Sequence, residues 1–516
     1  MVRLFVYFSL ISVIAVDAAR ILGLFPVPSI SHQIVFRGLT SELAKRGHEL
    51  VILTPNPALP KERPPDNVTE IDVSFGYERL RSLVLDNRKV FKRGVLVGAD
   101  AQLDPESYRF MLTLIIDMME CPELKEAIKG KQFDLIIAEA FMNYQLIFSK
   151  VLNAPLILFS SFHGFPESYD AIGATARHPI YYPTMLGDKF GGESLIDKFK
   201  QAKFEFDYYR SMKTLESFED EYLKQNYGPD TPTVRELVNN VDMLFINSHP
   251  VFCDNRPLPP NAVYVGPLHL KPLKEIPQDL KTILDNSKTG VIYVSLGTNV
   301  NTSDMDKDLF DAFLEAFREL PYDILWKLND DKIENLPKNV IVRKWFPQRD
   351  LLVHPNIKLF VTQGGLQSTD EAIDAEVPLV GIPMLGDQFY NVHKYVQLGI
   401  GVKVDALTLD KGSLLRGIQA VLNDESYKNN VKKLKQIMND QPESSLERAV
   451  WWTEYVIRHG GAKHLRASAA NISWSEYWMV DVIAAVLGVA VILLIAVFAA
   501  IKFLLTRLRQ PKVKKS

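Results

Sequence analysis

The sequence has 516 residues, more than one hydrophobic core usually accommodates, so we expect at least two domains. Its hydrophobic content of 47% and aromatic content of 10% exclude a mainly disordered protein. The net charge is −3 even though the C-terminal tail is basic, so the rest of the chain is acidic and no nucleic-acid partner is expected.

Residues 1–18 have the pattern of a secretory signal peptide. Arg3 provides a short positive region, Leu4 to Val16 is apolar, and small residues follow near Ala18. The alternatives are a first β-strand or a membrane anchor, but the apolar run is short for a span.

Residues 19–267 are predicted to form an N-terminal α/β domain. A strand from Arg20 to Val27 precedes a helix capped by Ser29 or Ser31, and a second strand follows, which makes a βαβ unit. Strands buried on both faces read as continuous apolar runs. Such runs occupy Glu49–Thr54, Phe133–Ala138, Pro155–Ser160, Met243–Asn247 and Ala262–Val265.

A Pro- and Lys-bearing linker is predicted at residues 268–288, and a second α/β domain at residues 289–460, whose last helices are expected to pack back on the first domain. Helices expected from Asp304, Gln348, Leu366 and Gln388 alternate with strands, which predicts two Rossmann-like, doubly wound domains facing a cleft. The predicted strands are Gly290–Leu296, Tyr322–Lys327, Val340–Lys344, Lys358–Thr362 and Pro378–Ile382.

The C-terminal part has the pattern of a membrane anchor. Residues 482–501 are uncharged and mostly apolar, long enough to cross a bilayer; a buried core helix is the alternative. A juxtamembrane segment at residues 461–481 precedes the span and contains Trp474, Tyr477 and Trp478, and a basic tail at residues 502–516 follows. The positive-inside rule predicts a single-pass type I protein with its domains across the membrane from a cytosolic tail.

Lys512 and Lys514 resemble a dilysine retrieval signal for the endoplasmic reticulum, the alternative being a tail attracted to anionic lipid.

Two loops at predicted strand ends have the composition of phosphate-binding loops. The first is Ser295-Leu296-Gly297-Thr298, where a glycine allows close approach of the backbone and hydroxyl groups can donate, although a plain turn gives the same pattern. The second runs from Gln363 through Gly364, Gly365, Gln367 and Ser368 into a helix, whose N-terminus attracts anions. Glu371 lies in the first turns of that helix and can accept from ribose hydroxyls; a structural turn and cap is the alternative.

Two further strand ends carry side chains suited to a nucleotide sugar. Asp387 and Gln388 offer a carboxylate and a carboxamide for sugar hydroxyls, or Asp387 acts only as a helix cap. Trp345 presents a flat face for a base and Gln348 can read its edge, or Trp345 is part of the core.

Together these motifs, from Trp345-Phe346-Pro347-Gln348 to Asp387-Gln388, resemble the donor-binding signature of the UDP-glycosyltransferase family over nearly the whole chain. The fragment from Phe360 to Ser368 is similar to insect members, and the two ends resemble animal members of the endoplasmic reticulum. The resemblance implies a GT-B fold and chemistry without a metal or other cofactor. Gln363 departs from the family, because many members have a histidine there, and glutamine cannot carry a charge.

The resemblance also assigns the catalytic residues, which spacing alone would not, since a loop histidine is more often structural. His32, after the first strand, matches the catalytic histidine of the family. Glu139 stands where the family has an aspartate that orients this histidine. The implied reaction is inverting transfer of a hexose, with glucose expected, from a UDP-sugar to a hydroxyl of a small lipophilic acceptor, as in detoxification or hormone and pigment conjugation.

Two other functions stay open at this point, a non-catalytic lumenal carrier of hydrophobic molecules and a glycosyltransferase that acts on lipid. The sequence does not name the acceptor, although 11 Phe or Tyr residues between Phe162 and Tyr209 are candidates to line its pocket or touch the membrane. Homo- or hetero-oligomers are possible.

The remaining candidate sites concern modification and metal binding. Cys121 and Cys253 are too few for a disulfide framework, and one bridge between them is left open. Asp304-Met305-Asp306 superficially matches a metal clamp but is better read as a helix start. N-glycosylation sequons occur at Asn67, Asn301 and Asn471.

Overall fold

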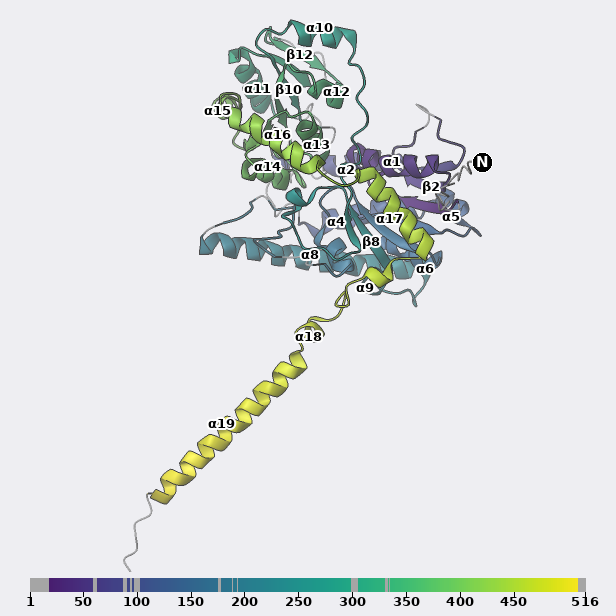
Figure 1. The fold of residues 1–516 in the computed structure, drawn as a ribbon, viewed down its shortest axis with the longest axis vertical. Coiled ribbons are helices and arrows are strands. Elements are labelled where there is room, and N and C mark those ends of the chain that lie inside the picture. The colour runs from purple at the N-terminus through teal and green to yellow at the C-terminus, as the bar shows by residue number, and fades with distance from the viewer. Residues whose placement is uncertain are drawn as a thin grey trace, which may run out of the picture.

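The computed structural model describes residues 18–58, 63–86, 91–92, 95–96, 103–174, 178–187, 189–192, 194–297, 305–329, 333 and 335–508. The predicted signal peptide up to residue 17, Thr298, Asn301, Asp304 and the tail from residue 509, with its two retrieval lysines, lie outside the described residues. The chain forms two α/β halves and one long helix that leaves the body (Figure 1).

The N-terminal half is built on a seven-stranded parallel sheet of order β3-β2-β1-β6-β7-β8-β9. Every predicted strand is present within a few residues; the prediction missed β3, whose partly exposed sequence lacks an apolar run. The strands are β1 (Arg20–Leu24), β2 (Glu49–Thr54), β3 (Val68–Asp72), β6 (Leu135–Glu139), β7 (Leu156–Ser160), β8 (Val241–Ile246) and β9 (Ala262–Tyr264).

The C-terminal half has a six-stranded parallel sheet of order β12-β11-β10-β13-β14-β15. The predicted strands are again present, and β15 was missed because this partly exposed edge strand contains a glycine and a lysine and so gives no apolar run. The strands are β10 (Val291–Ser295), β11 (Asp323–Lys327), β12 (Val340–Arg343), β13 (Ile357–Thr362), β14 (Leu379–Gly381) and β15 (Gly401–Lys403). Both halves therefore have the doubly wound, GT-B type architecture that the sequence predicts.

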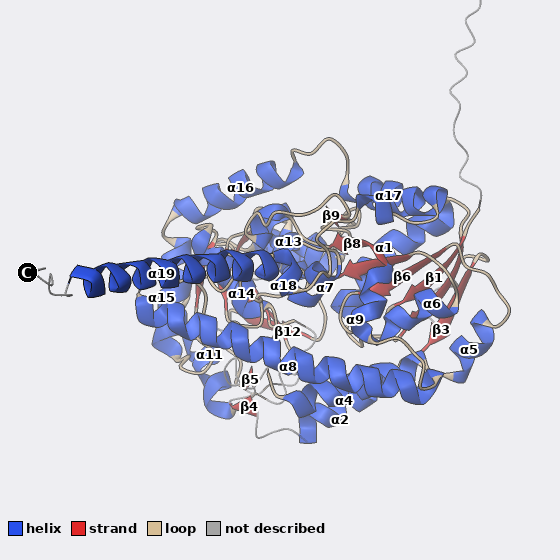
Figure 2. Cartoon of the chain, turned by 90° about the horizontal axis from the view of Figure 1, so that it is seen from below, coloured by secondary structure: helices blue, strands red, loops and turns tan. Residues whose placement is uncertain are grey.

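Helices cover both faces of each sheet (Figure 2). Those of the N-terminal half are α1 (Ile30–Lys45), α2 (Phe75–Asp86), α4 (Pro105–Met119), α5 (Pro122–Ile128), α6 (Ile147–Val151), α7 (Pro166–Ala171), α8 (Leu195–Tyr227) and α9 (Val234–Leu237). Those of the C-terminal half are α10 (Gln278–Asn286), α11 (Lys307–Glu319), α12 (Gln348–Leu352), α13 (Leu366–Asp374), α14 (Gln388–Gln397), α15 (Lys411–Leu422) and α16 (Glu425–Asn439). The small hairpin β4 (Phe91–Lys92) and β5 (Val95–Leu96) lies apart from both sheets.

Local details differ from the sequence expectations. Ser29 occupies the N-cap position of α1, but its side chain does not cap the helix; its hydroxyl is 2.9 Å from that of Ser31. The segment predicted as a linker contains α10, an amphipathic helix that buries Leu280 and Leu284 against the C-terminal sheet.

After α16 the chain returns to the N-terminal half as α17 (Ser445–His459). Ala449, Val450 and Val456 of α17 share a hydrophobic core with α1. Two connections thus join the halves, and they touch each other, because the Ser445 hydroxyl donates to the Gly266 carbonyl at 2.7 Å.

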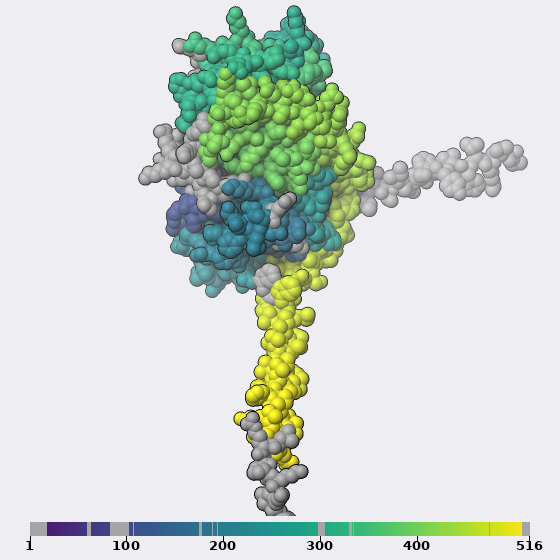
Figure 3. Space-filling view, turned by 90° about the vertical axis from the view of Figure 1, so that its left-hand side faces the viewer, coloured from purple at the N-terminus to yellow at the C-terminus, as the bar shows by residue number. Residues whose placement is uncertain are grey.

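Beyond α18 (Trp474–Tyr477), helix α19 (Val480–Leu508) extends away below the N-terminal half (Figure 3). It is the one helix among the described residues long and apolar enough to cross a membrane, and none of its most apolar stretch is buried against the body. Tyr477 and Trp478, just before it, are more than half exposed.

Both cysteines are buried and free, so Cys121 and Cys253 do not pair. At the sequon of Asn67, the side-chain amide donates to the carbonyls of Ala44 and His48 at 2.8 Å each. A glycan on that nitrogen would remove one of these bonds. Asn471 contacts Asn239 at 3.0 Å, near the start of the membrane-proximal segment.

Candidate active site

The first part of the site lies where the winding of the N-terminal sheet reverses, between β1 and β6. Ligands of doubly wound sheets bind at this point, beyond the carboxyl ends of the strands. His32 stands in the first turn of α1, directly after the loop that leaves β1, and Glu139 is the last residue of β6. The sheet order therefore brings together two residues that are 107 positions apart in the sequence.

His32 and Glu139 form a close pair, with Nδ1 of the imidazole 2.6 Å from Oε1 of the carboxylate. The Glu139 side chain is 2% exposed, whereas that of His32 is 16% exposed and so reaches the surface of the site. Burial raises the pKa of Glu139, and the hydrogen bond to His32 opposes that rise. A carboxylate accepts only, so the pair holds a proton on Nδ1 and leaves Nε2 with its lone pair.

The backbone around this pair is held by buried polar side chains. The second carboxylate oxygen of Glu139 accepts from the Val27 N–H at 3.2 Å, and Gln145 donates to the Glu139 carbonyl. The Gln33 amide donates to the carbonyls of Phe25 and Val27 at 3.0 Å each, which fixes the loop after β1. These hydrogen bonds restrict the movement of the His32–Glu139 pair.

Aromatic rings surround the exposed side of His32. The ring of Phe162 lies 5.4 Å from the imidazole and that of Phe141 lies 6.5 Å away, and both contact Phe165. Behind them, Tyr208 of α8 and Leu366 of α13 belong to one apolar cluster that spans the two halves. An apolar molecule with a hydroxyl group therefore has a fitting surface beside Nε2.

The second part of the site lies at the winding reversal of the C-terminal sheet, between β10 and β13. The two predicted glycine loops meet here, because Gly297 follows β10 and Gly364 follows β13. Gly297 and Gly364 have φ angles of +80° and +92°, in the left-handed region that favours glycine, and a Cβ on Gly364 would also lie 2.5 Å from Val392. Gly365 precedes the first turn of α13.

Gln363 itself is 8% exposed, and its carbonyl oxygen has no hydrogen-bond partner in the described part of the chain. In the neighbouring loop after β10, the Ser295 hydroxyl accepts from the Gly297 N–H at 3.4 Å. A buried polar group without a partner is costly, which favours a bound ligand at this position.

The predicted base-reading and ribose-binding residues form one hydrogen-bonded group. The Gln348 amide donates to the Ser368 hydroxyl at 3.0 Å and to the Glu371 carboxylate at 2.8 Å, and Tyr293 donates to its oxygen at 3.2 Å. Burial raises the pKa of Glu371, with the Gln348 bond opposing it. Trp345 is 64% exposed, so it is not a core residue and its face is available.

Asp387 occupies the N-cap position of α14, but its side chain does not cap the helix. Its carboxylate accepts from the Asn391 amide at 2.8 Å. Burial raises the pKa of Asp387, while that hydrogen bond and the nearby charge of His32 lower it. Asp387 therefore lies near the His32–Glu139 pair. Gln388 is buried and its oxygen accepts from the N–H groups of Met384 and Leu385.

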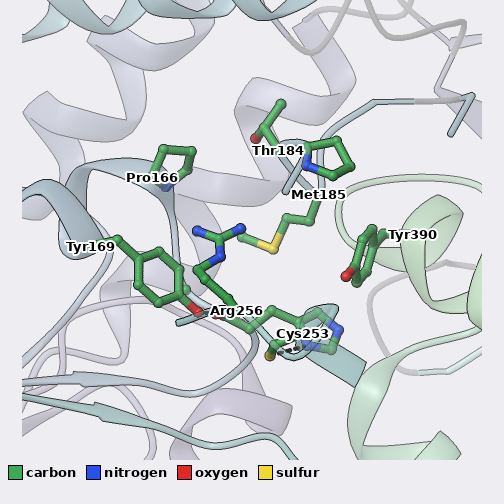
Figure 4. Close-up of a pocket in the computed structure, with 10 residues that line it drawn as sticks. Pro166, Tyr169, Thr184, Met185, Cys253, Arg256 and Tyr390 are labelled. Atoms are coloured by element: carbon green, nitrogen blue, oxygen red, sulfur yellow. Dashed lines mark hydrogen bonds between the residues drawn. The ribbon is translucent and has the colours of Figure 1, made fainter. Parts of the chain in front are cut away.

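Several contacts join the two halves beside the site. Gln367 donates to the Ser161 carbonyl at 3.0 Å, and its own carbonyl is 3.0 Å from His269. Tyr390 of α14 donates to the carboxylate of Asp254, which also pairs with Lys394. Figure 4 shows this interface from within, with Tyr390 facing Thr184 and Met185 and with Arg256 beside Tyr169.

One functional candidate was missed in the sequence. Lys327 is the last residue of β11, and its ammonium donates to the Gly297 carbonyl at 2.9 Å and lies 5.0 Å from the centre of the Trp345 ring. Burial lowers its pKa, and no carboxylate lies within ion-pair distance of it among the described residues. A lysine ending a strand gives no signal in the sequence; only the pairing of β11 with β10 moves it to the glycine loop.

A profile of the family described as UDP-glucoronosyl and UDP-glucosyl transferase matches residues 22–515. The chain belongs to this family. This UDP-glycosyltransferase is 42% identical over 480 residues to the ecdysteroid UDP-glucosyltransferase of Spodoptera littoralis nuclear polyhedrosis virus, covering 90% of this chain and 93% of that relative. It is 33% identical over 482 residues to UDP-glucosyltransferase 2 of Dactylopius coccus, covering 90% and 89%.

Solved structures agree with the fold. The UDP-glycosyltransferase is similar to a UDP-glucose:anthocyanidin 3-O-glucosyltransferase in complex with UDP, with a TM-score of 0.56 and 18% identity over 86% of this chain and 99% of that one. The calicheamicin glycosyltransferase matches with a TM-score of 0.57 over the same shares. The predicted family, enzyme class and GT-B fold are thus confirmed.

Proposed function

We propose that this enzyme transfers glucose from UDP-glucose to a hydroxyl group of a small lipophilic acceptor, with His32 as the general base and Glu139 as its orienting partner. The observation that carries the proposal is the 2.6 Å contact between His32 Nδ1 and the buried Glu139 carboxylate, at the switch point of the sheet and beside an aromatic surface. A non-catalytic carrier would have no use for such a pair.

In the proposed reaction, Nε2 of His32 takes the acceptor proton as the acceptor oxygen attacks the anomeric carbon of the sugar. The new bond forms on the face opposite the nucleotide, the bond between that carbon and the diphosphate oxygen breaks, and UDP leaves with its electron pair. Glu139 stabilises the imidazolium that results. Configuration at the anomeric carbon is inverted.

The donor is proposed to lie along the carboxyl ends of β10, β13 and β14. The base stacks on Trp345 and is read by Gln348, Glu371 accepts from the ribose, and backbone N–H groups around Gly365 meet the diphosphate. Asp387 accepts from sugar hydroxyls, and Gln388, whose oxygen is occupied by the backbone, can offer only its N–H groups.

Lys327 is proposed to supply a positive charge toward the diphosphate. An ammonium that is partly buried beside the glycine loop without a counter-ion is unfavourable until an anion binds. This charge compensates for Gln363, which can donate to the phosphates but cannot carry a charge.

The partners of nearby cations favour glucose over glucuronate. A glucuronate carboxylate needs a cation or several donors, and three cations that could serve are already engaged with other groups. Arg37 pairs with Glu70 at 3.2 Å, Lys394 pairs with Asp254, and Arg256 lies 4.1 Å from the centre of the Tyr169 ring. The relatives named as UDP-glucosyltransferases support the same choice of donor.

A hydroxysteroid is the proposed acceptor class. The rings of Phe141, Phe162 and Phe165 give His32 an apolar surface. Several curated relatives are named for ecdysteroids, including the viral enzyme that is 42% identical.

The test uses the full-length protein in microsomes with UDP-glucose, UDP-glucuronate and a panel of hydroxysteroids, phenols and fatty alcohols. We expect β-linked glucosides of a steroid or phenol, and at least ~10²-fold lower turnover in His32→Ala with UDP affinity retained. A product dominated by glucuronide would refute the proposed donor. Glucosides of fatty alcohols alone would refute the proposed acceptor class. Turnover near wild type in a folded His32→Ala protein would refute the role of His32 as the base.

We further propose that α19 anchors the enzyme in the endoplasmic reticulum membrane with both halves in the lumen. The basic tail and the predicted signal peptide support this orientation. Helix α8, which projects from the body (Figures 1 and 2), exposes Leu195, Phe199 and Phe206 at 83%, 70% and 59%, and these apolar side chains suit contact with a membrane surface. Protease added to sealed microsomes should remove only the segment beyond Lys502, and digestion of the body would contradict the orientation. Replacement of Lys512 and Lys514 by serine should allow part of the protein to leave the endoplasmic reticulum.

A further inference from the structure

His163 is a buried residue of the N-terminal half that the proposed chemistry does not use. It follows β7, is 4% exposed, and is enclosed by the rings of Phe252 and Tyr390, whose centres lie 6.4 Å and 5.0 Å from its own. Its Nδ1 is 3.0 Å from the Ser248 hydroxyl. Its Nε2 is 2.6 Å from the side-chain oxygen of Asn391, which belongs to the C-terminal half.

The hydrogen-bond partners fix the direction of every bond in this group. The Asn391 amide nitrogen faces two acceptors, the Gly364 carbonyl and the Asp387 carboxylate, each at 2.8 Å. Its oxygen must therefore face His163, and an amide oxygen only accepts, so the proton of His163 is on Nε2. The Ser248 hydroxyl then donates to Nδ1. Burial lowers the pKa of His163 to about 4, which keeps the ring neutral and this arrangement intact at physiological pH.

Both N–H groups and the oxygen of Asn391 are thus engaged, and its side chain is fully buried. Among the residues that the structure describes, His163 of the opposite half is the one partner of that oxygen. If the halves separate, that oxygen loses its partner and the amide is free to rotate away from Asp387 and from Gly364. Of the two groups that Asn391 holds, the Gly364 loop is also supported by the Thr362 hydroxyl, which accepts from the Gly364 N–H at 3.3 Å. The group that depends on Asn391 is therefore Asp387, the proposed sugar-binding carboxylate.

We propose that His163 is a positioning residue that couples docking of the two halves to the orientation of Asp387, and so sets the selectivity of the enzyme for the sugar of its donor. The inference rests on the proposed role of Asp387 in sugar binding. His163 touches neither the sugar nor the acceptor; it acts only through Asn391.

The proposal predicts that His163 matters for the sugar and not for the nucleotide. In the variant His163→Phe, which keeps the aromatic packing and removes the donor, binding of UDP-glucose should weaken about 10-fold while binding of UDP changes less than about 2-fold. His163→Gln places an N–H group close to the position of Nε2 and should recover most of the loss. In the double variant His163→Phe/Asn391→Leu the effects should not add, because both substitutions break the same chain of bonds.

The measurement is calorimetric titration of the full-length protein in detergent with UDP, UDP-glucose and UDP-galactose. A fall in affinity that is equal for UDP and for UDP-glucose would show a merely structural role and overturn the proposal, as would a folded His163→Gln protein that behaves like His163→Phe. If His163→Phe does not fold, Ser248→Ala removes the hydroxyl that donates to Nδ1 and leaves the Cys253 sulfur, 3.5 Å from that atom, as the remaining neighbour. This loosening of the ring should shift the ratio of the UDP-glucose affinity to the UDP affinity about 3-fold, and an unchanged ratio would count against the proposal.

The outcome separates this inference from the proposed function. A wild-type protein that transfers a sugar other than glucose would refute the proposed donor. The role of His163 can still be decided in that case. The measurement is then the ratio of the affinity for the UDP-sugar that the wild type uses to the affinity for UDP.

Discussion

Replacing Glu139 by glutamine should reverse the tautomer of His32. The second oxygen of Glu139 accepts from the Val27 N–H at 3.2 Å, and the first faces Nδ1 of His32 at 2.6 Å. A glutamine in this place must turn its oxygen toward Val27, since its NH₂ group cannot accept. That NH₂ group then donates to Nδ1, which moves the imidazole proton to Nε2, the atom that has to accept the acceptor proton.

The expected cost combines the wrong tautomer with the loss of the negative charge beside the imidazolium. Together they should lower turnover on alcohol acceptors by ~10³-fold, which corresponds to about 4 kcal/mol of the activation barrier. Glu139→Asp keeps the charge but is shorter by one methylene, so a loss of about 10-fold is expected. Glu70→Gln removes a carboxylate that pairs with Arg37 outside the site and should leave turnover near wild type.

The assay follows glucoside formation with saturating UDP-glucose and two acceptors, an aliphatic alcohol and a phenol acidic enough to be ionised at the assay pH. An ionised phenol needs no base, so the loss in Glu139→Gln should be much smaller with it than with the alcohol. Alcohol turnover within about 3-fold of wild type in a folded Glu139→Gln protein would refute the tautomer argument. An equal loss with both acceptors would show that Glu139 acts on something other than the proton.

Three other outcomes are expected. Lys327→Met should weaken UDP binding about 30-fold with little effect on uridine, and Lys327→Arg should weaken it less; an equal loss for uridine would assign Lys327 to the base or to folding. Since no metal is expected to take part, EDTA should leave turnover unchanged, and a loss that Mg²⁺ restores would contradict this expectation. Burial raises the pKa of Glu219 from 4.5 to about 8, so the folded state of the wild type should lose stability as the pH rises from about 4.5 to about 8. Glu219→Gln should remove this dependence, and its melting temperature should exceed that of the wild type more at pH 8 than at pH 5; parallel curves for the two proteins would contradict the assignment.

The sequence predicted the elements that repeat a strong pattern and missed those that do not. Parallel strands buried on both faces, such as β6 and β13, are apolar throughout and therefore visible. Strands β3 and β15 lie at sheet edges and are partly exposed, so neither has the continuous apolar run of a buried strand. Helix α10 follows a Pro-bearing segment, and its apolar stripe of Leu280 and Leu284 is too short to separate it from a linker.

The same contrast holds for the site. The two glycine loops follow buried strands and can be located from position alone, because all such loops meet at one edge of the sheet. His32 also follows a buried strand, but the family resemblance was needed to single it out. Lys327 and His163 could not be found in either way, because the proposed role of Lys327 depends on the neighbouring strand and that of His163 on a partner 228 residues away in the other half.

The contact between Ser445 and Gly266 has a consequence for how the enzyme opens. The chain passes between the halves twice, and the hydrogen bond of 2.7 Å pins the two passages together at one edge of the body. A Cβ on Gly266 would lie 2.4 Å from the backbone nitrogen of Ser248, so this point is also packed tightly against the N-terminal sheet. Two joints at one edge define a rotation axis, and motion of the halves is reduced to swinging about it rather than sliding or twisting. The distance between the halves on opening then grows away from that edge, so we expect substrates to enter and leave on the far side. A disulfide engineered across the halves on the far side should trap bound UDP. A disulfide engineered beside Ser445 should not.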